Sequence, residues 1–155
     1  MRCYRKRNEG KIDIIIPIYK FNKKLLKKCI DSVINQTIIE DCVIYLISNN
    51  SPQESELYDI YSEYWPGYNI ILLKTETNEQ GPAFARTVGI NNSYNTYFFC
   101  LDADDELYDK NSLELMYNYA EDNKIGILQG YTITSVLNGN FKEASPDGHS
   151  LLYNR

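Results

Sequence analysis

The chain has 155 residues, of which 43% are hydrophobic and 24% charged, with a net charge of −5. This length and composition fit one domain with a hydrophobic core and exclude a disordered tail or a mini-protein. The longest uninterrupted apolar stretches are too short to cross a bilayer, and the first residues lack the apolar segment of a secretory signal. We therefore expect a cytoplasmic protein.

The four cysteines, Cys3, Cys29, Cys42 and Cys100, are scattered along the chain and form no CxxC pair. Three of them lie within apolar patterns, which favours buried thiols over disulfides or zinc ligands. The single histidine, His149, follows a turn-like Ser-Pro-Asp-Gly stretch. We interpret it as a solvated loop residue and not as a catalytic base.

The charge is unevenly distributed along the chain. Residues 1–28 carry ten basic and two acidic side chains, a net charge of +8, whereas residues 29–155 carry a net charge of −13. The basic beginning could contact an anionic membrane surface, which would make the protein peripheral to the membrane; lysines solvated on a helix face are the simpler interpretation. The acidic remainder argues against nucleic-acid binding.

The first predicted element is a strand at residues 11–19, a run of β-branched residues that is typical of a buried parallel sheet. Pro17 is expected to mark its carboxyl end. Asn22 then fits the N-cap of a helix that extends to about Gln36, because apolar residues recur at helical spacing between them.

The next two strands are expected at residues 42–47 and 69–73. Between them, Ser51, Pro52 and Glu54 match a capping box with proline at the first helical position. This pattern predicts a helix to about Tyr64, in which tyrosine rings pack inward with their hydroxyls at the surface.

The remaining elements are a helix, an aromatic strand, a second helix and a strand, expected at residues 83–92, 97–101, 111 onward and 125–131. Gly81-Pro82 precedes the first of these helices, and Asn111 with Glu114 forms a capping box for the second. Asn138-Gly139 is a strong signal for a hairpin turn.

Strands that alternate with helices predict right-handed crossovers and an α/β fold with a doubly wound, mainly parallel sheet flanked by helices. Ligands of such sheets bind beyond the carboxyl ends of the strands. The segments expected at that edge are Tyr19, Ser48-Asn49-Asn50, the loop at Gly81 and residues 102–105. Tyr19 is placed where an aromatic ring could stack on a base or simply lie on the surface.

Three carboxylates lie within four residues, at Asp102, Asp104 and Asp105. Because like charges repel, such a cluster is stable when it faces water or binds a cation. Oxygen-only ligands favour Mg²⁺ or Mn²⁺, and an ion held by one or two carboxylates can bind a nucleotide diphosphate. The alternative is an acidic turn that caps the following helix. An EF-hand does not fit, since Leu113 occupies its twelfth position.

Four segments carry a resemblance by their order and spacing: residues 12–19 (IDIIIPIY), 26–37, 81–90 (GPAFARTVGI) and 99–105 (FCLDADD). Together they resemble the nucleotide-sugar-binding, N-terminal part of the family 2 glycosyltransferases, which have the GT-A fold. The resemblance covers the chain from about Ile12 to Gly130, and Asp102-Ala103-Asp104 matches the family's DxD motif.

The resemblance implies a nucleotide-sugar site made of Pro17, Tyr19, Asn49, Gly81, Arg86, Asp102, Ala103 and Asp104. It places Tyr19 against the base and Asp102 near the ribose. Asp104 would bind the Mn²⁺ or Mg²⁺ that bridges the donor diphosphate, with Asp102 as the second residue at the metal. A UDP-sugar is the favoured donor.

The chain departs from the family pattern at several positions. The family usually has two aspartates where this chain has Ser48 and Asn49, and the second commonly reads the uracil edge; an amide still offers a donor and an acceptor. Thr87 replaces the family's usual Asn. No residue matches the catalytic base, since Asp147 has a turn context. The charge distribution marks a basic segment at residues 1–10, and residues 11–155 are expected to form one domain. The missing acceptor half fits the donor-binding part of a longer enzyme, a truncated chain or a minimal protein.

The predicted function is a metal-dependent glycosyltransferase that moves a sugar from a nucleotide diphosphate to an acceptor hydroxyl with inversion. The acceptor would be a carbohydrate or a lipid-linked molecule, because polysaccharide and glycoconjugate synthesis is common in the resembled family. The alternative is a non-catalytic nucleotide-sugar-binding or partial domain that acts with a partner chain. A nucleotidyltransferase is disfavoured, since Ile18-Tyr19-Lys20-Phe21 is unlike a glycine-rich phosphate loop.

Overall fold

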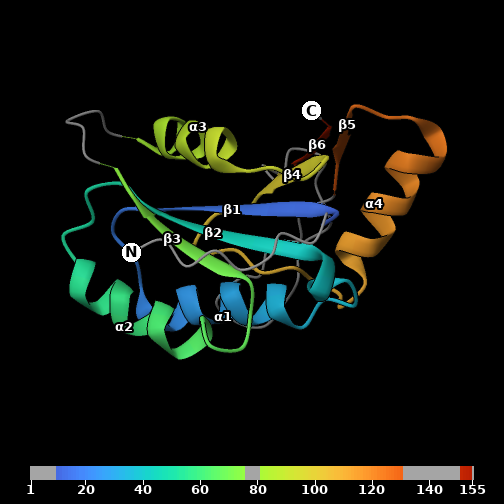
Figure 1. Ribbon diagram of the computed structural model, residues 1–155. Helices are drawn as coiled ribbons and strands as arrows, with labels where there is room; N and C mark the ends of the chain where they lie inside the picture. The colour runs from blue at the N-terminus through green and yellow to red at the C-terminus, as the bar shows by residue number, and fades with distance from the viewer. Residues whose placement is uncertain (1–9, 76–80, 131–150, 155) are drawn as a thin grey trace, which may run out of the picture.

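The computed structural model describes residues 10–75, 81–130 and 151–154, which form one six-stranded sheet with helices on both faces (Figure 1). The strands are β1 (Ile12–Ile18), β2 (Cys42–Ser48), β3 (Ile70–Lys74), β4 (Tyr97–Cys100), β5 (Ile127–Gln129) and β6 (Leu151–Asn154). The helices are α1 (Lys23–Ile34), α2 (Glu54–Tyr64), α3 (Pro82–Asn92) and α4 (Ser112–Asn123), with a short 3₁₀ turn at Ile39–Asp41. No helix in these described ranges is long and apolar enough to cross a membrane.

The strand order is β3-β2-β1-β4-β6-β5. The four strands β1 to β4 are parallel to one another, whereas β6 is antiparallel to both of its neighbours, β4 and β5. The expected α/β fold with a mainly parallel sheet is confirmed. Strand β6, which joins β5 to the rest of the sheet, was not predicted from the sequence. The expected turn at Asn138-Gly139 lies outside the described residues.

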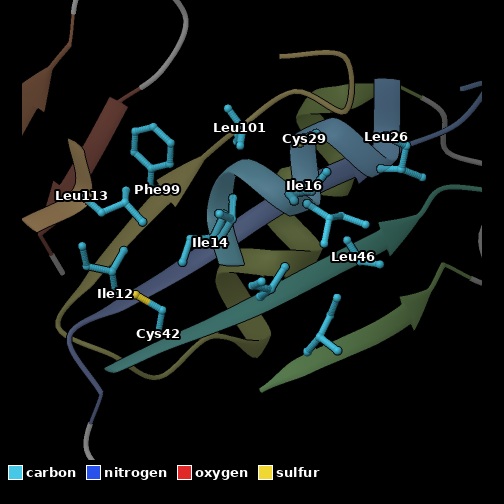
Figure 2. Packing of buried hydrophobic residues seen from close by; sticks show 14 of the residues in the cluster. Ile12, Ile14, Ile16, Leu26, Cys29, Cys42, Leu46, Phe99, Leu101 and Leu113 are labelled. Atoms are coloured by element: carbon cyan, nitrogen blue, oxygen red, sulfur yellow. The ribbon is translucent and has the colours of Figure 1, made fainter. Parts of the chain in front are cut away.

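Two hydrophobic clusters cover the two faces of the sheet. On one face, alternate residues of β1 (Ile12, Ile14, Ile16) pack with buried residues of α1, α2 and α4 (Figure 2). On the other face, Ile15 packs with Ala85 of α3. Gly89 of α3 lies directly over β1, because a Cβ added there would meet Ile15 Cγ2 at 2.5 Å. The close approach of α3 to the central strand therefore depends on a glycine.

The predicted end of β1 near Pro17 and the predicted start of α1 at Asn22 are confirmed. The Asn22 side chain accepts hydrogen bonds from the backbone N–H groups of Lys24 (2.9 Å) and Leu25 (3.2 Å), which makes it the N-cap of α1. Pro17 is the second-last residue of β1 and lies beyond the β1–β4 pairing, which ends at Ile15 opposite Cys100. Its missing N–H therefore costs no hydrogen bond on the β4 side.

Both predicted capping boxes are wrong, because their glutamates accept hydrogen bonds from side chains outside the box. The Ser48 hydroxyl donates to Glu54, and the Thr37 hydroxyl donates to Glu114 at 2.7 Å. Helix α2 accordingly begins at Glu54, and neither α2 nor α4 has a side-chain cap bond. Tyr58 is also unlike its prediction, since it is 61% exposed, whereas Tyr61 and Tyr64 pack against the core as expected.

The predicted buried thiols are confirmed for three cysteines, Cys29, Cys42 and Cys100, all of which are buried and free of disulfides. Cys3 and His149 lie outside the described residues.

Asp13 is a buried carboxylate that fastens the segment after α3 to β1. It is 1% exposed and accepts hydrogen bonds from the backbone N–H of Tyr94 (2.5 Å) and of Asn95 (2.7 Å) and from the Asn95 side-chain amide (2.9 Å). Replacing Asp13 with alanine leaves these buried donors unsatisfied, and we expect a loss of about 3 kcal/mol of unfolding free energy.

Urea unfolding followed by circular dichroism measures this loss, with Asp122→Ala as the control because Asp122 is an exposed acid on α4. We expect the control to stay within about 0.5 kcal/mol of the unchanged protein. Equal stability of the two variants would contradict a fastening role for Asp13.

Candidate functional site

A pocket of about 350 Å³ lies beyond the carboxyl ends of two central strands. Its lining comes from the end of β1, the residue after β2 and the start of α3, and comprises Pro17, Ile18, Tyr19, Asn49, Gly81, Pro82 and Ala85. Four of these, Pro17, Tyr19, Asn49 and Gly81, are among the eight residues expected from the sequence. The parallel sheet thus brings together segments that are up to 68 residues apart in the chain.

The pocket combines apolar walls with one exposed aromatic ring. Ile18 and Ala85 are 2% and 1% exposed, so both belong to the floor of the pocket as well as to the core. Tyr19 is 46% exposed and directly follows β1. An exposed ring beside an apolar floor offers a flat ligand a surface for stacking.

Asn49 holds three segments together at the pocket wall. Its side-chain amide Nδ2 donates to the backbone carbonyl of Gly81 at 3.1 Å, and its Oδ1 accepts from the Thr75 hydroxyl at 3.0 Å. The Gly81 carbonyl can only accept, so the nitrogen must face it and the oxygen must face Thr75. Asn49 is 3% exposed, and only an amide can make both contacts at neutral pH. Sequence reasoning missed Thr75, because no motif signals this contact.

Gly81 has a backbone conformation that other residues avoid. Its φ is +116° with ψ 157°, and a Cβ added there would meet no atom within 4 Å. The reason for glycine is therefore the conformation and not the space. Gly81 is also the N-cap of α3, with Pro82 at the first helical position and no side-chain cap, so the positive end of α3 lies at the pocket.

Gly81→Ala is expected to lower the unfolding free energy by about 1–3 kcal/mol, because alanine is strained at this φ. Thermal unfolding measures this loss. Gly126→Ala is the matched control, since a Cβ at Gly126 meets nothing within 4 Å and the φ of Gly126 is not positive. Equal melting temperatures for the two variants would show that the chain relaxes at Gly81 without cost.

Arg86 and Asp102 form an ion pair between α3 and the end of β4. Arg86 Nη2 lies 2.5 Å from Asp102 Oδ1, and the two side chains are 29% and 34% exposed. Asp102 is the second residue after β4, which pairs with β1 as far as Cys100 opposite Ile15, two residues before Pro17 of the pocket. Arg86 Nε is buried without a hydrogen-bond partner among the described residues, which leaves one unsatisfied donor beside the pocket.

Asp104 lies in the loop after β4 and differs from Asp102 in its surroundings. It is exposed and has no ion pair with the described residues, while Asp102 is bound by Arg86. The two carboxylates supply the hard oxygen ligands that Mg²⁺ and Mn²⁺ prefer, so the donor set fits either ion. Across the described ranges, no group of three or more His, Cys, Asp or Glu side chains is arranged for a metal. Ala103 and Asp104, which follow Asp102 in the chain, are not among the residues that line the pocket.

The two cysteines nearest the site remain protonated at neutral pH. Burial raises the pKa of Cys100 to about 11, an effect that the nearby Arg86 partly opposes. Burial also raises the pKa of Cys29, and the four acidic residues of the loop after β4 raise it further. Cys29 donates its S–H to the Asp102 carbonyl at 3.4 Å. These thiols are therefore neutral hydrogen-bonding and packing groups.

An open α/β sheet with a pocket beyond its parallel strands, beside a helix N-terminus, is the architecture of Rossmann-like nucleotide-binding proteins. The family follows from the sequence, which matches one family model over almost the whole chain. The chain belongs to glycosyl transferase family 2, whose family model matches residues 13–154.

Two relatives are named poly(ribitol-phosphate) glycosyltransferases. The chain is 32% identical over 143 residues to a poly(ribitol-phosphate) beta-glucosyltransferase of Bacillus spizizenii, covering 88% of this chain and 22% of that protein. It is 30% identical over 121 residues to the poly(ribitol-phosphate) beta-N-acetylglucosaminyltransferase TarP of Staphylococcus aureus, covering 77% of this chain and 36% of that protein. The chain thus spans about a fifth to a third of these relatives.

Solved structures confirm the expected GT-A fold. The structure of Staphylococcus aureus TarS in complex with UDP-GlcNAc matches with a TM-score of 0.68 and 21% identity, over 77% of this chain and 33% of that one. The mannosyltransferase PcManGT of Pyrobaculum calidifontis, in complex with GDP-Man and Mn²⁺, matches with a TM-score of 0.69 and 17% identity, over 79% and 35%.

Proposed function

We propose that this chain is the donor-binding part of a glycosyltransferase and that it binds a nucleotide diphosphate sugar, with UDP-sugars favoured. The observation that carries the proposal is the position of the pocket between Tyr19, Asn49 and the start of α3, with the Arg86–Asp102 pair at its side. Membership of glycosyl transferase family 2 and the nucleotide ligands of the two solved neighbours support it.

The pocket suits the base of the donor. In our proposal the Tyr19 ring lies against the base, while the apolar floor at Ile18 and Ala85 excludes water below it. The Asn49 side-chain amide has two N–H groups, and one of them donates to the Gly81 carbonyl. In our proposal the other N–H donates to an acceptor on the edge of the base. Asp102 then lies next to the ribose.

The positively charged groups suit the diphosphate. Arg86 has an unsatisfied buried Nε–H, and the N-terminus of α3 at Gly81 lacks a side-chain cap, so both can donate to phosphate oxygens. Asp104, with Asp102, would hold Mn²⁺ or Mg²⁺. The chemistry that such an ion supplies is neutralisation of the charge that develops on the leaving diphosphate.

In the proposed reaction, an acceptor hydroxyl oxygen forms a bond to the anomeric carbon while the bond from that carbon to the diphosphate oxygen breaks. Attack on the side opposite the diphosphate inverts the configuration, and a base takes the hydroxyl proton. Asp147, the late acid considered from the sequence, lies outside the described residues. We assign the chain donor binding and leave the base unassigned.

The proposed acceptor is a carbohydrate or a lipid-linked molecule, made during synthesis of a surface polysaccharide or glycoconjugate. We extend the proposal to a cytoplasmic location next to an anionic membrane. The exposed Lys23 and Lys24 of α1 support it, although Lys27 and Lys28 are held in ion pairs with Glu63 and Glu106. Equal binding to neutral and anionic lipid vesicles would contradict the membrane part.

Calorimetric titration of UDP, GDP, CDP and ADP, each with and without Mn²⁺, tests the proposed function. We expect UDP to bind most tightly and Mn²⁺ to strengthen its binding. Release of UDP from UDP-GlcNAc when a poly(ribitol phosphate) acceptor is added would show turnover, and binding without release would favour a non-catalytic module. Absence of binding to all four nucleotides by folded protein would contradict the proposal.

A further inference from the structure

Three side chains at the C-terminal end of α1 hydrogen-bond to the segment after β4. Cys29 and Ser32 are three residues apart on α1. Gln36 follows the helix, which ends at Ile34, and donates back to the Ser32 carbonyl. We call them the α1 polar row. The segment that they contact, residues 102–113, begins with the carboxylates Asp102 and Asp104 and ends in the first turn of α4.

The row contacts this segment at four points along its length. Cys29 donates to the Asp102 carbonyl at 3.4 Å, and Ser32 Oγ accepts from the Leu107 N–H at 3.0 Å. Further along, Gln36 donates to the Asp109 carbonyl at 2.7 Å and accepts from the Leu113 N–H at 3.0 Å.

Neighbouring contacts strengthen the connection. The Thr37 N–H donates to the Lys110 carbonyl at 2.8 Å, and the exposed Lys28–Glu106 pair, 3.2 Å apart, adds only weakly to it. Within the segment itself, backbone bonds join near neighbours, such as the Asp105 N–H to the Asp102 carbonyl at 3.0 Å. Contacts with α1 and the residues just after it therefore determine most of the path of this segment.

Gln36 is the most constrained member of the row. It is 3% exposed, and its Nε2 donates both hydrogens, one to the Asp109 carbonyl and one to the Ser32 carbonyl at 3.0 Å. Its Oε1 faces the Leu113 N–H. Since carbonyls only accept and an N–H only donates, the orientation of the amide is fixed and no carboxylate can replace it at neutral pH.

We propose that Cys29, Ser32 and Gln36 are positioning residues that hold Asp102 and Asp104 in place for the nucleotide diphosphate and its divalent cation. This inference rests on the proposed function, because the carboxylates matter only if they bind this ligand. It assigns an indirect part in donor binding to α1, a helix that contributes no residue to the pocket lining.

Ser32→Ala and Gln36→Glu test the proposal, and Tyr64→Phe is the matched control. The Tyr64 hydroxyl donates to Asp31 of α1 at 2.9 Å, so this control removes a bond to the same helix from α2 and leaves the row intact. Cys29→Ser keeps a donor towards Asp102, whereas Cys29→Val removes it.

The first measurement is hydrogen exchange at the Leu107 and Leu113 amides, which needs no ligand. We expect exchange to be about tenfold faster at Leu107 in Ser32→Ala and at Leu113 in Gln36→Glu, with both amides unchanged in Tyr64→Phe. Unchanged exchange at both amides in the row variants would overturn the proposal.

The second measurement is the affinity for Mn²⁺ by electron paramagnetic resonance and for UDP with Mn²⁺ by calorimetry. Gln36→Glu adds a negative charge at the far end of the segment that carries the carboxylates, so electrostatics alone would if anything strengthen cation binding. Positioning predicts the opposite, a loss of about tenfold in both row variants, with Cys29→Ser closer to the unchanged protein than Cys29→Val.

Tighter Mn²⁺ binding by Gln36→Glu, or equal losses in Tyr64→Phe, would overturn the proposal. Failure of the proposed function itself is recognised separately, since the unchanged protein would then bind neither Mn²⁺ nor UDP. In that case the row would have no ligand to position, whatever the exchange rates show.

Discussion

Asp104→Ala is expected to weaken Mn²⁺-dependent UDP binding by at least about 100-fold, because it removes the exposed carboxylate that we assign to the metal. Asp102 cannot fully replace it, since one of its oxygens is held by Arg86. Binding of UDP without Mn²⁺ should change far less, because the pocket that we assign to the base contains neither aspartate. Calorimetric titration with and without the metal measures both quantities.

Glu106→Gln is the control for this result. It removes one negative charge two residues further along the same loop, where Glu106 pairs with Lys28 in an exposed position. We expect its UDP affinity to stay within about threefold of the unchanged protein. If both variants lose the same affinity, the loop attracts the cation through its summed charge, and Asp104 has no individual role.

Asn49→Asp is expected to weaken UDP binding at pH 7.5 by at least about tenfold, although it restores the residue that is usual in the resembled family. The new carboxylate would set an oxygen against the Gly81 carbonyl, which accepts from the Asn49 amide in this chain. Two acceptors facing each other repel, so the Gly81 turn and the start of α3 should move away from the pocket.

The pH dependence of this variant has a definite sign. Burial and the facing carbonyl should raise the pKa of an aspartate at this position above its ordinary value of about 3.9. The folded protein then holds the proton more tightly than the unfolded chain, so the variant loses stability as the pH rises through the raised pKa. Below that pKa, the protonated carboxyl can donate to Gly81 in place of the amide.

Denaturant unfolding between pH 4.5 and pH 8 measures this difference, with Thr75→Val as the control because it removes the other Asn49 contact without adding a titrating group. The stability gap between Asn49→Asp and the unchanged protein should widen with pH, and the gap for Thr75→Val should stay constant. Tighter UDP binding by Asn49→Asp at pH 7.5 would show that position 49 serves the base and not the Gly81 turn.

The sequence was sufficient for the parallel half of the sheet and for the pocket edge. Runs of β-branched residues located β1 and β2, and the rule that ligands bind beyond the carboxyl ends of parallel strands placed Tyr19, Asn49 and Gly81 together. These features depend on the residue pattern within each strand and on the alternation of strands and helices, and both can be recognised in short stretches of sequence.

Features that depend on distant partners were not predictable in this way. Glu114 matched a local capping pattern, yet it accepts a hydrogen bond from Thr37, 77 residues away in the chain. Glu54 also matched such a pattern but accepts from Ser48, which lies outside the predicted capping box. Strand β6 has four residues, and its pairing joins it to β4 and β5. The contacts of Asn49 with Thr75 and of Gln36 with Leu113 likewise join residues 26 and 77 positions apart.

The strand order has a consequence for the way in which the protein folds during its synthesis. Strands β1 to β4 can assemble as soon as they have left the ribosome, but β5 is separated from β4 by β6, so β5 cannot join the sheet until residues 151–154 have been made. During that interval the β4 edge exposes unpaired backbone groups, which can pair with other chains. Arrival of β6 completes this side of the sheet and ends the exposure of β4.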